Sequence, residues 1–210
     1  LQPVMDAFAI HPYADNSSQP PDVPHPVSTT IGVADYGKLV ALLGEAFDGT
    51  AQLGSTLPIL YDEFGVEAVV PPEKASLYTG TEPATTRPVD EATQAAYYRR
   101  ALELTFCQPN VTGILFFHTH DEPGLPAWQS GVYYVDGTPK TSLPAVRAAL
   151  AATRGGSVAR CPGLRLKLKS TIEFDPRRLS VRFRCHLDCA YRLRLVKLPA
   201  RSTTAAKSGV

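Results

Sequence analysis

Residues 58–67 have the sequence PILYDEFGVE, and this stretch decides the fold. Its apolar run 59–61 is typical of a buried strand. The run ends abruptly in Asp62 and Glu63, followed by an aromatic residue and a glycine. The carboxyl end of a strand is where α/β enzymes present catalytic groups, so Glu63 is the first candidate for chemistry. The alternative is that Asp62 and Glu63 are solvated loop acids.

Two further apolar runs have the same character. Residues 7–10 lead into His11 and Tyr13, and residues 113–117 lead into His118. Each run is apolar throughout, as in the strands of a parallel sheet covered on both faces. Helical spacing separates the runs, over 36–47, 90–105 and from 142 to 150, with Asp35 and Asp90 as expected N-caps. Strand–helix alternation with long loops after the strands predicts βα units.

About three such units are visible, whereas a whole (β/α)8 barrel takes about 250 residues. The predicted fold class is α/β: residues 1–154 form the C-terminal portion of a TIM barrel, and its missing N-terminal part is an expected partner. In residues 155–200, apolar residues alternate with Arg and Lys, which predicts a small antiparallel β-sandwich-like module. Residues 201–210 are expected to be a disordered tail.

Composition narrows the function classes. The 210 residues carry a formal charge of +1, which argues against nucleic acid and anionic membranes as partners. No apolar run approaches the length of a membrane span. Cys185 and Cys189 form a C-x3-C pair, for which a short-range disulfide in a secreted protein is favoured over a zinc site. No metal and no cofactor are expected.

Four segments carry a family resemblance. His11-Pro12-Tyr13 looks like the H-x-Y that ends the sixth strand of clan A glycoside hydrolases, and residues 59–65 look like their seventh-strand motif. Residues 113–118 look like the eighth strand, and WQSGVYYVDGTPK at 128–140 is similar to the loop before the last helix. Residues 7–150 thus resemble the C-terminal part of these retaining, cellulase-like and xylosidase-like (β/α)8 enzymes.

The resemblance implies a retaining hydrolase of O-glycosidic bonds in a glycoside or polysaccharide, with Glu63 as the nucleophile. It implies substrate-binding roles for His11, Tyr13, His118 and Trp128. The family's acid/base glutamate follows an asparagine, and no Asn-Glu pair occurs in these 210 residues, so the acid/base is expected upstream. The alternative function is a non-catalytic carbohydrate-binding or structural protein on a barrel scaffold.

Overall fold

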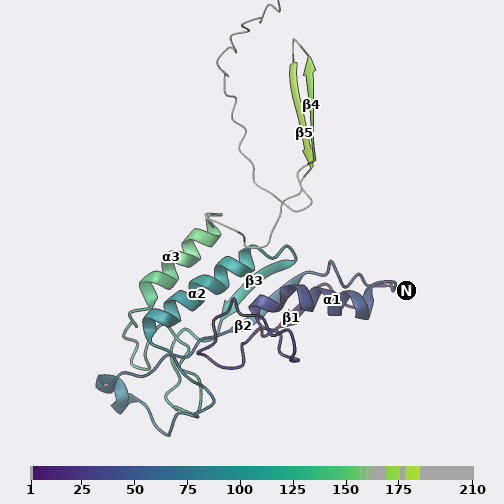
Figure 1. Ribbon diagram of the computed structural model, residues 1–210. Helices are drawn as coiled ribbons and strands as arrows, with labels where there is room; N and C mark the ends of the chain where they lie inside the picture. The colour runs from purple at the N-terminus through teal and green to yellow at the C-terminus, as the bar shows by residue number, and fades with distance from the viewer. Residues whose placement is uncertain (1, 157, 159–160, 162–168, 176–177, 185–210) are drawn as a thin grey trace, which may run out of the picture. The chain divides into compact units, whose positions relative to one another are not determined.

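The computed structural model describes residues 2–156, 158, 161, 169–175 and 178–184, and it divides into two units, Leu1–Leu164 and Arg165–Val210. The first unit is an α/β arrangement in which three strands alternate with helices (Figure 1). Its elements are β1 (Phe8–Ile10), η1 (Val33–Asp35), α1 (Tyr36–Phe47), β2 (Ile59–Phe64), η2 (Pro72–Leu77), α2 (Glu91–Phe106), β3 (Val111–Phe116) and α3 (Leu143–Arg154). None of the helices in the described ranges combines the length and apolar character that crossing a membrane requires.

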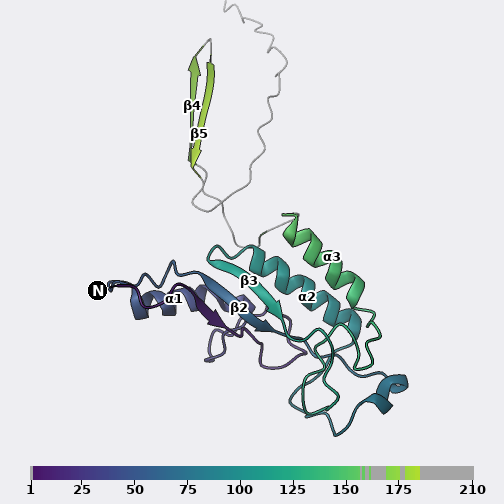
Figure 2. The ribbon, with the colours of Figure 1, turned by 180° about the vertical axis from the view of Figure 1, so that it is seen from behind.

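The strands form one parallel sheet in the order β1-β2-β3. Phe8 pairs with Ile59, and Ile59 in turn with Val111, so the three carboxyl ends meet at the same edge of the sheet. The loops that follow the strands gather at this end (Figure 2). The parallel α/β arrangement predicted from the three apolar runs is confirmed. The remainder of a barrel stays a prediction.

Strand β2 runs three residues further than its apolar run, so that Asp62 and Glu63 lie inside the strand. Tyr61 of β2 pairs with Ile114 of β3, and the next pair is Phe64 with Phe116. Between these two pairs β2 advances by three residues and β3 by two. Irregularities of this kind bend a strand and redirect a side chain, and they are frequent beside active sites. The irregularity at 62–63 therefore sets where the two carboxylates point.

The core lies where the helices pack on the sheet. Its most enclosed side chains are Ile59 and Tyr61 of β2 and Tyr98 of α2, each at most 1% exposed. Leu39 and Leu43 of α1 and Val146 of α3 belong to the same cluster. Burial of an aliphatic or aromatic side chain contributes roughly 1.5–3 kcal/mol, so this cluster fixes the strand ends that carry the polar residues.

A buried carboxylate joins the loop after β1 to the start of α1. Asp35 is predicted as an N-cap and occupies that position, but its side chain makes no capping hydrogen bond. It accepts hydrogen bonds from His25 N at 2.7 Å, His25 Nδ1 at 2.7 Å and Gly32 N at 2.9 Å instead. Burial raises the pKa of the Asp35 carboxyl, but the hydrogen bonds from His25 and Gly32 outweigh it, and the net shift is downward. Asp35 thus pins the loop over residues 25–32.

We expect Asp35→Asn to destabilise the protein by about 1–3 kcal/mol, because the amide nitrogen faces backbone and imidazole donors. Since the folded pKa lies below the unfolded one, this stabilisation is present above the unfolded pKa and is lost as pH falls through the folded pKa. Denaturant unfolding at neutral and acidic pH measures both. Asp22→Asn, which removes an exposed ion pair with Arg100, is the control and costs ~0–1 kcal/mol. An equal cost in the two variants would contradict the assignment.

A disulfide joins Cys107, at the end of α2, to Cys161. The two residues are 54 positions apart in the sequence, so no local cysteine spacing predicts the pair. The predicted pair Cys185–Cys189 lies outside the described residues.

The second unit contains β4 (Lys169–Asp175) and β5 (Arg178–Arg184), which pair as an antiparallel hairpin. The hairpin falls within residues 155–200, where the alternation of apolar and basic residues predicts antiparallel strands. Most of the 155–200 stretch outside this hairpin, and the predicted disordered tail, lie outside the described residues. The sandwich-like module therefore stays a prediction.

Candidate active site

Tyr13 brings the ends of β1 and β2 together. Its hydroxyl donates a hydrogen bond of 2.8 Å to Glu63 Oε1. Burial first, then this hydrogen bond and the Glu63 charge, raise the pKa of the Tyr13 hydroxyl well above its ordinary value. Tyr13 therefore keeps its proton at any physiological pH and serves as a permanent donor to one oxygen of the carboxylate.

His11 lies on the other side of the same carboxylate. Its Nδ1 is 3.6 Å from Glu63 Oε2, and its Nε2 is 3.5 Å from Asp62 Oδ1. The His11 side chain is half exposed, whereas that of Glu63 is 20% exposed. Oε1 of Glu63 is thus held by Tyr13, while Oε2 faces an imidazole at the open side of the site.

Aromatic rings form a wall beside Glu63. The ring centroids of Tyr13 and Trp128 are 5.2 Å apart, and Phe117 meets Trp128 edge-on at 5.6 Å. Trp128 is held by its backbone, whose N–H donates to Glu122 Oε2 at 3.3 Å and whose carbonyl accepts from Glu122 N at 2.9 Å. An indole held beside the Tyr13 ring offers a flat apolar surface with a polar edge.

The five predicted site residues fall into two groups. Glu63, His11, Tyr13 and Trp128 are brought together. His118 has Glu122 and Ser130 as polar partners: its Nε2 is 3.8 Å from Glu122 Oε1, and its backbone N–H donates to Ser130 Oγ at 3.0 Å. The peptide bond between Phe117 and His118 is cis. The substrate-binding role of His118 stays a prediction.

Gly65 allows the chain to turn away directly after the acids. A Cβ at this position would lie 2.5 Å from Phe117 O and 2.9 Å from Ser130 Cβ. Only glycine permits this close approach between the end of β2 and the loop after β3. The glycine that follows the acids in the sequence is thus a packing requirement of the site.

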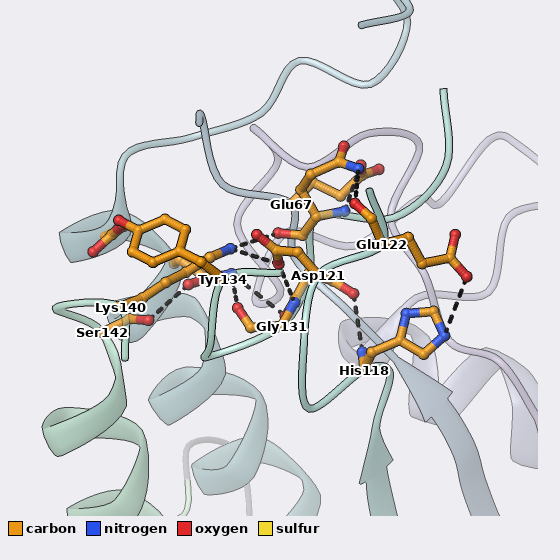
Figure 3. Close-up of polar contacts among 12 residues, drawn as sticks. Glu67, His118, Asp121, Glu122, Gly131, Tyr134, Lys140 and Ser142 are labelled. Atoms are coloured by element: carbon orange, nitrogen blue, oxygen red, sulfur yellow. Dashed lines mark hydrogen bonds and ion pairs between the residues drawn. The ribbon is translucent and has the colours of Figure 1, made fainter. Parts of the chain in front are cut away.

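The 128–140 segment proves to be mainly structural. Lys140 Nζ is 2.8 Å from Asp121 Oδ1, and both side chains are at most 1% exposed. Lys140 also donates to Gln129 O at 2.9 Å, and Gly131 N donates to Asp121 Oδ1 at 3.0 Å (Figure 3). This network holds the loop between β3 and α3 and thereby sets the position of Trp128.

Glu67 is a polar residue near the site to which the sequence analysis assigned no role. Glu67 belongs to the fold-deciding stretch, four positions after Glu63, but only three-dimensional packing shows that it is 7% exposed. Burial raises its pKa to about 7. Among the described residues no cluster of three or more metal-ligating side chains is present.

The fold and this geometry can be set beside known proteins. No family model matches the chain, and no curated protein matches it. Among solved structures it is similar to a family 39 glycoside hydrolase from Bacteroides cellulosilyticus WH2, with 18% identity over 81% of this chain and 29% of that one, at a TM-score of 0.44. An exo-β-agarase is 16% identical over 61% and 16% of the two chains, also at 0.44.

A β-glucuronidase from Bifidobacterium dentium is 18% identical over 70% of this chain and 21% of its own, at a TM-score of 0.38. The chain thus spans between about a sixth and a third of the length of these three proteins. At such identities and scores, the similarity carries no argument about the role of any residue. The solved structures that this α/β chain resembles are glycoside hydrolases.

Proposed function

We propose that the chain is the nucleophile-bearing part of a retaining glycoside hydrolase of the (β/α)8 type. The observation that carries the proposal is the Tyr13–Glu63 hydrogen bond at the carboxyl end of a parallel sheet, beside the ring of Trp128. A retaining enzyme needs a carboxylate that attacks the anomeric carbon and an aromatic surface for the sugar. Both are supplied here by the loops and strand ends that the sequence singles out.

Glu63 is the attacking group in this proposal. With Oε1 bonded to Tyr13, Oε2 forms the bond to the anomeric carbon, and the glycosidic C–O bond breaks with its electron pair on the leaving oxygen. Tyr13 keeps the carboxylate oriented through this hydrogen bond. His11 faces Oε2 and positions it.

The second carboxyl that retention requires is proposed to be a glutamate outside these 210 residues, as is the rest of the barrel. The first and third strands of the described sheet each pair on one side only. Unpaired edges favour association with further strands. A secreted location is proposed too, and the Cys107–Cys161 disulfide is compatible with an oxidising compartment.

Covalent trapping tests the proposal on the complete protein, in which the rest of the proposed barrel is present. A panel of 2,4-dinitrophenyl 2-deoxy-2-fluoroglycosides supplies a leaving group that needs no proton, so the nucleophile alone suffices. We expect one glycosyl unit to add to the protein, detected by intact mass, with the ester on Glu63 in the peptide map. An adduct on another residue, or no adduct with any sugar of the panel, would overturn the assignment.

The second candidate is a non-catalytic carbohydrate-binding protein. It is favoured by the partly exposed rings of Tyr13 and Trp128, which can hold a sugar without chemistry. In that case the fluoroglycosides bind reversibly and the protein mass does not change.

A further inference from the structure

A cavity of about 330 Å³ lies next to the Tyr13–Trp128 pair. It is formed by the loop after β1, the chain after β2 and the loop between β3 and α3. Its volume is near the lower end of the range for small-molecule sites, about 300–1,000 Å³. The cavity therefore suits one ring of monosaccharide size.

The cavity is distinct from the space in front of Glu63, which is not among its lining residues. Tyr13 separates the two: its ring lines the cavity, and its hydroxyl donates to Glu63. Trp128 also lines the cavity. The aromatic wall of the candidate active site is thus shared, and a second ring can lie on it next to the first.

Glu67 and His25 are the buried polar residues that line this cavity, and each is 7% exposed. The backbone of Glu67 is fixed on both sides, because Ser17 Oγ accepts from its N–H at 3.1 Å and its carbonyl accepts from Val89 N at 3.0 Å. Its side-chain Oε2 accepts from Gln129 N at 3.4 Å. No described residue donates a hydrogen bond to Glu67 Oε1. This oxygen is also not one of the fully buried side-chain atoms that lack a partner, so protein does not enclose it completely. A cavity-lining residue 93% removed from solvent thus keeps one carboxyl oxygen without a hydrogen-bond partner among the described residues.

The charges around the cavity select against an anionic ligand. Asp15 and Glu67 line it together with His25, whose Nδ1 is paired with the Asp35 carboxylate, and no lysine or arginine occurs among its described lining residues. Burial raises the pKa of Glu67 to about 7, the charges of Glu82 and Asp121 raise it further, and the N–H of Gln129 and the charge of Lys140 lower it. Near neutral pH the Glu67 carboxyl is therefore partly protonated and can both accept from and donate to a hydroxyl. The charge of the Glu67 carboxylate in turn helps to raise the pKa values of the Tyr13 and Tyr98 hydroxyls.

Side-chain amides and hydroxyls complete the lining. They come from Asn16, Ser17, Gln19, Thr85 and Thr86. A mostly apolar wall with a few convergent polar groups is the usual composition of a small-molecule site. An uncharged polyol ring satisfies all of these groups, whereas a uronate would bring a second carboxylate against Glu67.

We propose that this cavity is a second sugar subsite that takes an uncharged pyranose, with a ring hydroxyl hydrogen-bonded to Glu67 Oε1 and a ring face on Trp128. The proposal rests on the proposed function for the ligand class, but it requires no catalysis by this chain. Glu67 would then be a specificity-determining residue that distinguishes neutral sugars from acidic ones.

Trp128 provides the measurement, because it is the only tryptophan of the chain. Its fluorescence is titrated with methyl β-D-glucopyranoside, galactopyranoside and xylopyranoside, and with methyl β-D-glucuronide. We expect at least one neutral glycoside to bind, with the glucuronide weaker by 10-fold or more. Glu67→Ala is expected to raise the Kd of the neutral sugar about 10-fold, while Glu45→Ala on the exposed face of α1 leaves it unchanged.

A second variant guards against a folding defect in Glu67→Ala. Thr85 is an exposed lining residue, so Thr85→Phe fills the cavity without touching the core and is expected to abolish binding. Binding of the neutral sugars unchanged in both variants, equal or tighter binding of the glucuronide, or no binding of any neutral sugar would overturn the subsite. Fluoroglycoside labelling of the wild-type protein separates the two proposals. Labelling of Glu63 together with sugar binding that Glu67→Ala and Thr85→Phe leave unchanged means that only the subsite is wrong, whereas absence of the label means that the proposed function is wrong.

Discussion

Replacing Glu63 by glutamine is expected to lower the release of dinitrophenolate from an activated glycoside by roughly 10³-fold or more. The carboxamide keeps the size of the side chain and can still accept from Tyr13, but its oxygen is a poor nucleophile. Because dinitrophenolate departs without a proton, the loss reports on the attacking group and not on an acid. Release of dinitrophenolate followed by absorbance is the measurement.

Chemical rescue distinguishes a nucleophile from any other carboxylate. In Glu63→Ala, azide can occupy the vacated space, attack the anomeric carbon and expel dinitrophenolate, giving a glycosyl azide of the opposite anomeric configuration. Glu45→Gln is the matched control and keeps full activity, since Glu45 lies exposed on α1. Undiminished turnover in Glu63→Gln, or an azide product with retained configuration, would exclude Glu63 as the nucleophile.

Tyr13→Phe gives an intermediate loss under the same proposal. It keeps the ring beside Trp128 and removes the 2.8 Å hydrogen bond to Glu63 Oε1. A hydrogen bond to a charged group contributes about 1.5–3 kcal/mol, which corresponds to ~10- to 10²-fold in rate. A loss equal to that of Glu63→Gln would mean that Tyr13 takes part directly in the chemistry.

The elements that the sequence predicts correctly are those set by local patterns. Asp90, Thr93 and the helix behind them follow the N-cap rule, and the structure has the Asp90 side chain accepting from Thr93 N at 2.6 Å. The three strands were predicted because uninterrupted apolar runs suit a parallel sheet. The full length of β2 was not predicted, because Asp62 and Glu63 are polar and owe their extended conformation to pairing with β3.

Features that depend on contacts between distant segments could not be predicted. Asp35 has the right residue type and position for an N-cap, yet it bonds to His25, ten residues away. The Cys107–Cys161 disulfide and the burial of Glu67 likewise depend on where loops meet. In the candidate site, the sequence supplied the strand ends and therefore Glu63, His11 and Tyr13, whereas the cavity beside them is made by loops whose conformation no periodicity encodes.

The largest stability effect is expected at the buried Lys140–Asp121 pair. Burial lowers the pKa of Lys140 and raises that of Asp121, and their mutual attraction opposes both shifts without cancelling them. Each buried charge of the pair is therefore stabilised by the opposite charge of its partner. Lys140→Met is expected to cost about 3–5 kcal/mol, because it leaves the Asp121 carboxylate enclosed with Tyr78 and Gly131 as its remaining donors.

Denaturant unfolding of Lys140→Met against Lys74→Met measures this cost. Lys74 pairs with Asp136 at the same 2.8 Å, but the two side chains are 22% and 32% exposed, so its loss is expected to be ~0–1 kcal/mol. The penalty in Lys140→Met also depends on pH. Without its partner, Asp121 has a folded pKa still further above the unfolded one, so the folded state binds the extra proton and stability falls as pH rises between the two values. The destabilisation should therefore shrink in acid, and a pH-independent cost, or one equal to that of Lys74→Met, would show that the buried charge is not its cause.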